Sequence, residues 1–315
     1  MKYSNLGKTG IAVSRLCFGT LTIGPLQARL SLEEGASLLV EAFDNGINFF
    51  DTAEIYLNYD YIRNAFKGVN PKPVVATKSY AYKASTMEQS LSRALKEMAL
   101  EVIDIFLLHE QESEKTIRGH YEALEYLIRA KEKGYVRAVG ISCHTVSAVE
   151  GALKYPEIEI IHPLFNRRGI GIRDGTPRQM LEAVEKAVER DIGIYAMKPL
   201  GGGHLIQEAE KALQFVLSQN SIHSVAVGMQ SREELLFNQA IFSGSPVPED
   251  VRTGLQHKSR RIVVQDWCRG CGECTQHCPQ GALTVAKDKA VVNGDLCIFC
   301  GYCGRYCDEL CIKIF

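Results

Sequence analysis

Among the residues of this sequence, the cysteines have the spacing that indicates a chemical function most clearly. Nine of the eleven lie between residues 268 and 315. Eight of those form two runs with the same pattern, in which three cysteines at intervals of three are followed by a fourth. The first run is Cys268, Cys271, Cys274 and Cys278, and the second is Cys297, Cys300, Cys303 and Cys307. Thiolates at these intervals are typical of iron–sulfur cluster ligands.

This spacing resembles that of bacterial ferredoxins with two 4Fe–4S clusters, in which the fourth cysteine of each run ligates the other cluster. The resemblance implies one cluster on Cys268, Cys271, Cys274 and Cys307, and a second on Cys278, Cys297, Cys300 and Cys303. Cys311 aligns with Ala282 of the first repeat, so we expect it to be a small buried side chain and not a ligand.

Zinc sites and disulfide scaffolds are the alternatives for so many cysteines. Zinc sites usually use two separate pairs of cysteines, without a triple run. A disulfide framework requires export, and the start MKYSNLGKTG lacks the basic and apolar regions of a secretion signal. The cysteines therefore predict iron–sulfur clusters in a reducing cytoplasm.

A second set of polar residues stands at or just beyond the ends of apolar runs. Asp51 follows INFF, Tyr56 lies five residues later, Lys78 follows VVAT, and His109 follows IDIFLL. Taken singly, each has an ordinary explanation as a helix cap, a packing residue, a solvated amine or a core histidine.

The elements that carry these residues alternate between strands and helices. We expect strands near 16–19, 47–50, 74–77, 103–108, 136–141, 158–161, 193–197 and 224–227, and amphipathic helices such as 85–99, 115–133 and 176–190. Eight apolar strands separated by helices predict an α/β fold, the (β/α)8 TIM barrel. A doubly wound open sheet is the competing fold, but no GxGxxG follows the first strand.

Length and composition set the domain organisation. The chain has 315 residues, 46% of them hydrophobic, and a TIM barrel needs about 250. We predict a barrel over residues 1–244, a linker over 245–261, and a small α+β ferredoxin-like iron–sulfur domain over 262–315. The linker is indicated by the segment SGSPVPED, which follows Phe242. We expect this domain to pack on the C-terminal mouth of the barrel, with a helical segment 249–261 alongside.

Charge and hydropathy argue against two classes of partner. The formal net charge is −1, which gives no reason to expect a nucleic acid. No apolar stretch approaches the ~18–20 residues of a membrane-spanning helix, so we expect no membrane partner either.

The barrel region resembles the aldo-keto reductases. The resemblance rests on LGKTG near the start, GINFFDTAEIY, the Lys and His strand ends, VRAVGIS and MKPLGGG. It implies that Asp51, Tyr56, Lys78 and His109 form a catalytic tetrad. In that reading Lys78, held by Asp51, lowers the pKa of the Tyr56 hydroxyl. Tyr56 then protonates a carbonyl oxygen as hydride arrives at carbon, and His109 orients that oxygen.

The same resemblance implies an NADP or NAD site. The residues implied to bind it are Gly19, Thr20, Asp51, Ser142, His162, Met197, Lys198, Leu200, Gly201, Gly228, Gln230, Arg232 and Asn238. Cys143, His162 and Met197 replace the family's usual Asn, Gln and Tyr. Lys198 and the Gly201–Gly203 run are then free to hold a phosphate, although a glycine triplet is also typical of a flexible loop.

The predicted function is an oxidoreductase that interconverts carbonyls and alcohols, with Tyr56 as general acid, beside two one-electron clusters. Its expected partners are a small carbonyl or alcohol and a redox protein. Two alternatives stay open. One is a non-catalytic subunit whose barrel docks the ferredoxin domain, and the other is a flavin-linked electron-transfer protein, for which the sequence offers no flavin motif.

Overall fold

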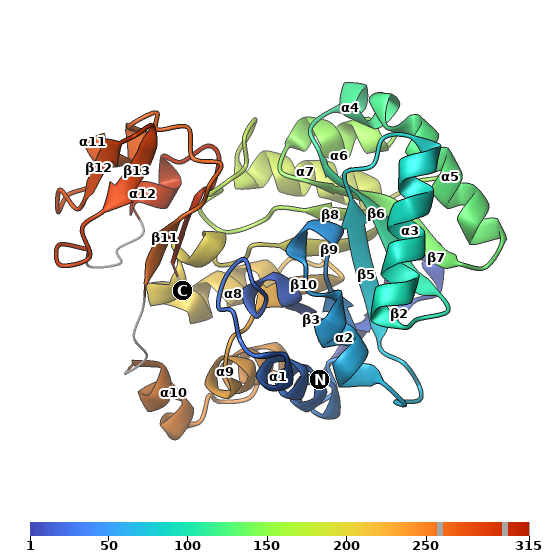
Figure 1. Cartoon of the computed structure of the whole chain (residues 1–315), viewed down its shortest axis with the longest axis horizontal. Helices are drawn as coiled ribbons and strands as arrows, with labels where there is room; N and C mark the ends of the chain where they lie inside the picture. Colours follow the sequence, from blue (N-terminus) through green and yellow to red (C-terminus); the bar gives the residue numbers. More distant parts are fainter. Residues whose placement is uncertain (257–260, 298–301, 315) are drawn as a thin grey trace.

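A closed barrel of eight parallel strands forms the larger part of the molecule (Figure 1). The computed structural model describes residues 1–256, 261–297 and 302–314. The barrel strands are β3 (Leu16–Gly19), β4 (Phe49–Asp51), β5 (Val74–Ser79), β6 (Ile103–Gln111), β7 (Val136–Cys143), β8 (Ile160–Pro163), β9 (Gly193–Met197) and β10 (Ser224–Gly228). Each pairs with its neighbours in sequence, and β10 closes the barrel against β3. The predicted (β/α)8 fold is confirmed.

Helices surround the barrel. They are α1 (Leu32–Asp44), α2 (Tyr59–Phe66), α3 (Ala84–Met98), α4 (Glu114–Gly119), α5 (Tyr121–Glu132), α6 (Val146–Ala152), α7 (Pro177–Val188), α8 (Ala209–Leu217) and α9 (Arg232–Ser243). Reciprocal side-chain and backbone hydrogen bonds cap α1 at Ser31 and Glu34, where the sequence has the S-x-x-E pattern. The single helix predicted over 115–133 is wrong: two helices meet at His120, directly after Gly119, a poor helix former.

A hairpin that the sequence did not reveal covers the amino-terminal end of the barrel. It consists of β1 (Tyr3–Asn5) and β2 (Ala12–Ser14). Its apolar residues Leu6, Ile11 and Val13 are buried in one cluster with interior residues of the strands, such as Phe49. Because this end is packed shut, the cavity described below opens at the opposite mouth, where the polar strand ends lie.

The C-terminal domain is a small α+β unit. It contains β11 (Ile262–Val264), α11 (Glu273–Gln276), β12 (Leu283–Ala286), β13 (Lys289–Val292), α12 (Tyr302–Arg305) and β14 (Ile312–Ile314). β11 pairs with β14 and β12 with β13, both antiparallel. Several cysteines, Cys274 and Cys303 among them, are buried together with Leu283 and Ile312 in its core. The predicted small α+β domain is confirmed.

The linker helix α10 (Glu249–Gln256) packs beside α9 on the outside of the barrel. Its Arg252 forms an ion pair with Glu210 at 3.1 Å. The sequence predicted a helical segment as far as residue 261, and residues 257–260 of that segment lie outside the described part of the chain.

The C-terminal domain packs on the C-terminal mouth of the barrel, as we predicted from the sequence. Figure 1 shows it in orange and red, with its last strand beside the yellow segment that follows β9. Strand β14 lies against a short 3-10 turn, η4 (Gly201–Gly203). The carbonyl oxygen of Ile312 is 2.8 Å from Nε2 of His204, and Leu310 is buried against Leu164 and Leu205 of the barrel. The contact combines apolar burial with a hydrogen bond between a barrel side chain and the backbone of β14.

The glycine at the end of η4 makes this contact sterically possible. Gly203 has a φ of 95°, and a Cβ atom there would overlap the carbonyl oxygen of Ile314.

Gly203→Ala is therefore expected to detach β14 while the barrel stays folded, which hydrogen–deuterium exchange would report as faster exchange in the C-terminal peptide. Gly244→Ala is the matched control, because Gly244 also has a positive φ, 76°, but nothing lies near its Cβ position. Both variants bear the ~1–2 kcal/mol conformational cost of the left-handed region, and only the first adds the overlap. Unchanged protection of β14 in Gly203→Ala would contradict this account.

Candidate active site

A buried ion pair between β4 and β5 forms the base of the site. Lys78 is only 1% exposed, and its Nζ lies 2.7 Å from Oδ2 of Asp51. The same ammonium donates to the carbonyl oxygen of Thr52, also at 2.7 Å. An unpaired buried charge would cost several kcal/mol, and these two partners offset that cost for Lys78. The predicted pairing of Asp51 with Lys78 is thus present in the structure.

Asp51 has two further neighbours inside the barrel. The Tyr195 hydroxyl donates to its Oδ1 at 3.0 Å, and the His162 ring stacks on Tyr195 with centroids 3.8 Å apart. Nε2 of His162 is itself 3.8 Å from the same carboxylate oxygen. The sequence did not single out Tyr195, and its only signal was a hydroxyl-bearing residue within an otherwise apolar strand. These contacts fix the orientation of the carboxylate on which Lys78 depends.

Tyr56 comes from the loop after β4, at the end of the 3-10 turn η3 (Glu54–Tyr56). The Lys78 Nζ lies 5.1 Å from the centroid of its ring. Burial, followed by the negative charges of Asp51 and Glu110, raises the pKa of the Tyr56 hydroxyl well above its usual value. This direction is opposite to the one expected from Lys78, because burial and the two carboxylates determine the net shift. Tyr56 stays protonated at physiological pH.

His109 lies in β6, within a register irregularity between Leu108 and Gln111. The next residue, Glu110, has a positive φ of 49°, and such a bulge turns the side chains that follow it. Burial and the neighbouring Lys78 lower the pKa of His109 to about 3, so its imidazole is neutral. Its Nδ1 is buried without a hydrogen-bond partner among the described residues.

Tyr80 packs against the ring of His109. The two rings stack with centroids 4.4 Å apart, and the Tyr80 hydroxyl donates to Oε2 of Glu110 at 2.6 Å. Neither Tyr80 nor Glu110 was predicted from sequence. Their positions next to Lys78 and His109 at two adjacent strand ends were the available signal.

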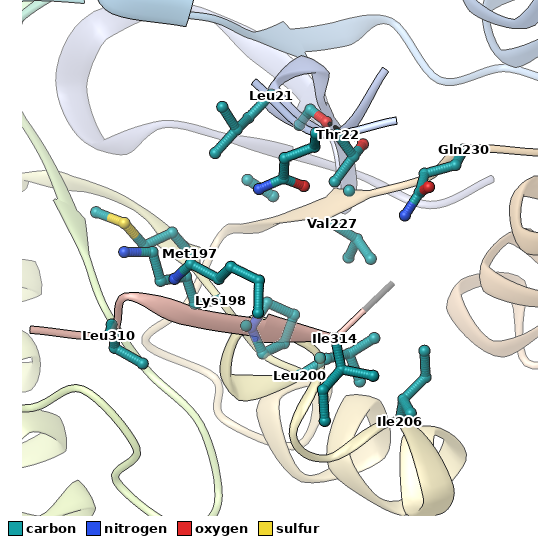
Figure 2. Close-up of a pocket in the computed structure, with 18 of the residues that line it drawn as sticks. Leu21, Thr22, Met197, Lys198, Leu200, Ile206, Val227, Gln230, Leu310 and Ile314 are labelled. Atoms are coloured by element: carbon teal, nitrogen blue, oxygen red, sulfur yellow. Dashed lines mark hydrogen bonds between the residues drawn. The ribbon is translucent and has the colours of Figure 1, made fainter. Parts of the chain in front are cut away.

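A cavity of about 1160 Å³ opens above the tetrad and extends to the C-terminal domain. Asp51, Tyr56 and His109 line it, and most of the predicted nicotinamide residues do so too: Gly19, Asp51, His162, Met197, Lys198, Leu200, Gly228, Gln230 and Asn238. Figure 2 shows Met197, Lys198 and Leu200 on one wall, with Gln230 and Thr22 farther along the cavity. The dimensions and this arrangement fit an elongated dinucleotide.

Four residues predicted to bind the nicotinamide cofactor do not line the cavity, and each has another contact. The Thr20 hydroxyl donates to the Asp51 carbonyl oxygen, and the Ser142 hydroxyl accepts from the Glu110 backbone N–H at 2.9 Å. Gly201 packs against Ile170, and Arg232 pairs with Glu41 on the surface.

The glycine run also has other contacts. The N–H groups of Gly201 and Gly203 already donate to Lys198 and Leu200 carbonyl oxygens, so they are not free for a phosphate. The run instead allows β14 to approach the barrel, as described above for Gly203.

The cysteines of the C-terminal domain fit the predicted cluster ligands. Burial, followed by the negative charges of Cys307, Cys268 and Cys271, raises the pKa of Cys274 to about 11, which reflects how closely these four thiols gather. Backbone N–H groups point at two of the sulfurs, from Ala290 to Cys268 and from Ala282 to Cys278. Such hydrogen bonds are typical around cluster sulfurs.

Other features of the cysteines agree with this fit. All those in the described part of the chain are free, and none joins a group there that could hold a single metal ion. A four-iron cluster needs no such convergence, because each thiolate binds its own iron. Cys300 lies outside the described residues. In the part of the chain that the structure describes, no helix is both long and apolar enough to cross a membrane.

Two family models match different parts of the chain. The aldo/keto reductase family model matches residues 15–215, and the 4Fe-4S dicluster domain model matches residues 261–308. L-galactose dehydrogenase from Arabidopsis thaliana is 24% identical over 277 residues, covering 75% of this chain and 86% of that protein. The uncharacterized oxidoreductase YqkF from Bacillus subtilis is 23% identical, covering 84% of this chain and 99% of that protein.

Solved structures agree in fold. A putative aldo-keto reductase from Pseudomonas aeruginosa has a TM-score of 0.66 and 25% identity, covering 77% of this chain and 94% of its own. An aldo-keto reductase from Bacillus halodurans has a TM-score of 0.67 at 22% identity. The family match spans more than half of the chain and includes all four tetrad positions. This chain therefore belongs to the aldo/keto reductase family and is an oxidoreductase that carries a 4Fe–4S dicluster domain in its C-terminal region.

Proposed function

We propose that the barrel reduces a small carbonyl compound, or oxidises the corresponding alcohol, with NADP or NAD and with Tyr56 as the proton donor. The observation that carries this proposal is the buried Lys78–Asp51 pair beneath Tyr56 and His109 at the wall of one large cavity. The proton donor, the orienting imidazole and the ion pair that supports them thus lie at one cavity wall, where a carbonyl oxygen can bind.

Each residue has a distinct role in this reaction. As a carbon–hydrogen bond forms at the carbonyl carbon, the π electrons move onto oxygen, and Tyr56 transfers its hydroxyl proton to that oxygen. His109, neutral because its pKa is lowered to about 3, acts as a hydrogen-bonding partner that fixes the oxygen's position. Tyr80 and Glu110 position His109, and Asp51 holds Lys78 beneath the Tyr56 ring.

The nicotinamide supplies the hydride, which carries two electrons. His162 and Met197 would contact its ring end, while Gly228, Gln230 and Asn238 line the far end of the cavity, suited to the adenosine. Arg232 forms an ion pair with Glu41 at the surface, so in this conformation it would not bind a 2′-phosphate. The residues at the adenosine end are thus compatible with either dinucleotide.

The C-terminal domain would hold two 4Fe–4S clusters, each of which exchanges single electrons. Coupling them to a two-electron hydride reaction needs a converter, for which we propose a separate redox protein. Because thiolate-bound clusters require reducing conditions, we also propose a cytoplasmic location.

One observation favours a second candidate, a flavin-linked or non-catalytic electron-transfer protein. Cys143, where the family has the carboxamide-binding Asn, is fully buried, and the adjacent Ser142 hydroxyl is engaged with Glu110. The cavity wall thereby lacks two of the family's contacts to a nicotinamide.

Anaerobically prepared, cluster-loaded protein distinguishes the candidates. We expect NADPH or NADH to quench or shift protein fluorescence on binding, and the complex to reduce an aromatic aldehyde in a spectrophotometric assay. Failure of both dinucleotides to bind would overturn the reductase proposal. A flavin absorption band that persists after the clusters are removed would instead support the electron-transfer alternative.

A further inference from the structure

Two lysines from different domains line the same part of the cavity. Lys198 follows β9 in the barrel, and Lys313 lies in β14 of the C-terminal domain. Lys313 is 6% exposed, and its Nζ would lie 3.3 Å from a Cβ on Gly202, directly over η4. Figure 2 shows Lys198 on the cavity wall, near Leu310 and Ile314 at either end of the segment that contains Lys313.

Neither ammonium is paired with a carboxylate in the described part of the chain. The hydrogen-bond partner of Lys198 is Nε2 of His144 at 2.9 Å, and burial lowers the pKa of that histidine, which leaves it neutral. The carboxylate of Glu110 raises the pKa of both lysines through its charge, but it accepts the Tyr80 hydroxyl and forms no ion pair with either lysine in the described residues. Glu112 pairs with Arg173. Lys78, by contrast, has Asp51 at 2.7 Å.

This arrangement is costly without a negative charge. Burial, and then repulsion from Lys198, lower the pKa of Lys313 to about 7, and burial lowers that of Lys198 to about 8. Lys313 is buried and Lys198 is half-buried, and two such cations that repel each other are stabilised when a further anion lies between them. Lysine is a common point-charge partner of phosphate and carboxylate groups.

We propose that Lys313 and Lys198 together bind an oxyanionic group, a phosphate or carboxylate, of the molecule that occupies the cavity. The C-terminal domain thereby supplies part of the binding site of the barrel. If the proposed function holds, the group belongs either to the diphosphate of the nicotinamide cofactor or to an acidic carbonyl substrate. The site itself requires only the two lysines and the cavity.

Inorganic phosphate is the probe that tests the site directly. We expect calorimetric titration of the cluster-loaded full chain at pH 6.5 to detect binding. Lys313→Gln and Lys198→Gln should each weaken it by about tenfold or more, whereas Lys313→Arg should retain it. The matched control is Lys289→Gln, because Lys289 belongs to the same domain but pairs with Asp266 away from the cavity. Iron content, measured for each variant, should equal that of the wild type.

Two outcomes would overturn the proposal: no phosphate binding to the wild type at millimolar concentration, or unchanged affinity in Lys313→Gln with its iron content intact. The source of the anion follows from a second pair of measurements on Lys313→Gln. A weakened NADPH affinity assigns the site to the cofactor diphosphate. An unchanged NADPH affinity, with a raised KM only for carboxylate-bearing aldehydes, assigns it to the substrate. If no dinucleotide binds the wild type, the reductase proposal fails while the phosphate result still decides this one.

Discussion

Replacement of Tyr56 by phenylalanine is expected to slow carbonyl reduction by a factor of about 10²–10⁴ while dinucleotide affinity stays nearly unchanged. The variant loses only the hydroxyl that delivers the proton, and the ring that lies over Lys78 remains. Burial and the carboxylates of Asp51 and Glu110 keep this hydroxyl protonated. The Tyr195 hydroxyl, which also meets the Lys78–Asp51 pair, donates to Asp51 and is not among the residues that line the cavity. Steady-state kinetics and fluorescence titration of the same preparation measure the two effects.

Tyr59→Phe provides the matched control for that experiment. Tyr59 begins α2, three residues beyond Tyr56, and its hydroxyl hydrogen-bonds Thr77 at 2.7 Å, away from the cavity. Its loss should cost about 1 kcal/mol of stability and leave the rate within a few-fold. If Tyr56→Phe retained activity close to that of Tyr59→Phe, another group would have to be the acid.

The strands and the tetrad were predictable because both follow simple periodic rules. Each predicted strand is present, since runs such as those around Val75 and Ile105 are apolar on both faces, as a buried parallel sheet requires. Parallel strands in a barrel end at one mouth, so polar residues at consecutive strand ends must converge. Asp51, Lys78 and His109 do so.

Side-chain direction was less accessible from the sequence. Alignment assigned Ser142 a position near the cofactor, but its hydroxyl turns to the Glu110 N–H, which the bulge in β6 brings within reach. Nothing in the apolar pattern of β6 encodes the positive φ of Glu110. The direction of the Tyr56 pKa shift was also mispredicted, because burial and then the carboxylates of Asp51 and Glu110 determine it.

The individual contacts between the two domains could not be predicted from the sequence either. A glycine triplet reads as a loop until β14 is seen to pack on it, and Lys313 reads as a surface lysine of a short strand. Both become informative only after the C-terminal domain is placed on the mouth of the barrel. Long-range packing of this kind has no local sequence pattern.

The cluster ligands give the second large expected effect. Cys271→Ser is expected to lower the iron content from about eight to about four per chain, because it removes a ligand from one cluster and leaves the four ligands of the other. Cys311→Ala is the matched control and should retain about eight. Iron and acid-labile sulfide analysis after anaerobic purification measures both.

The contrast between these two variants rests on the surroundings of Cys311. Its sulfur is only 3.3 Å from that of Cys307 and is buried in the same core, so proximity alone does not separate ligand from neighbour. The pKa directions do: the hydrogen bond between the two sulfurs lowers the pKa of Cys307 and raises that of Cys311, which favours Cys311 as the donor. A thiol that keeps its proton is a second-layer donor to the ligand sulfur, and its removal should shift the potential of that cluster to more negative values. Loss of about four irons in Cys311→Ala would instead make Cys311 a ligand, and Cys307 would then be the neighbour.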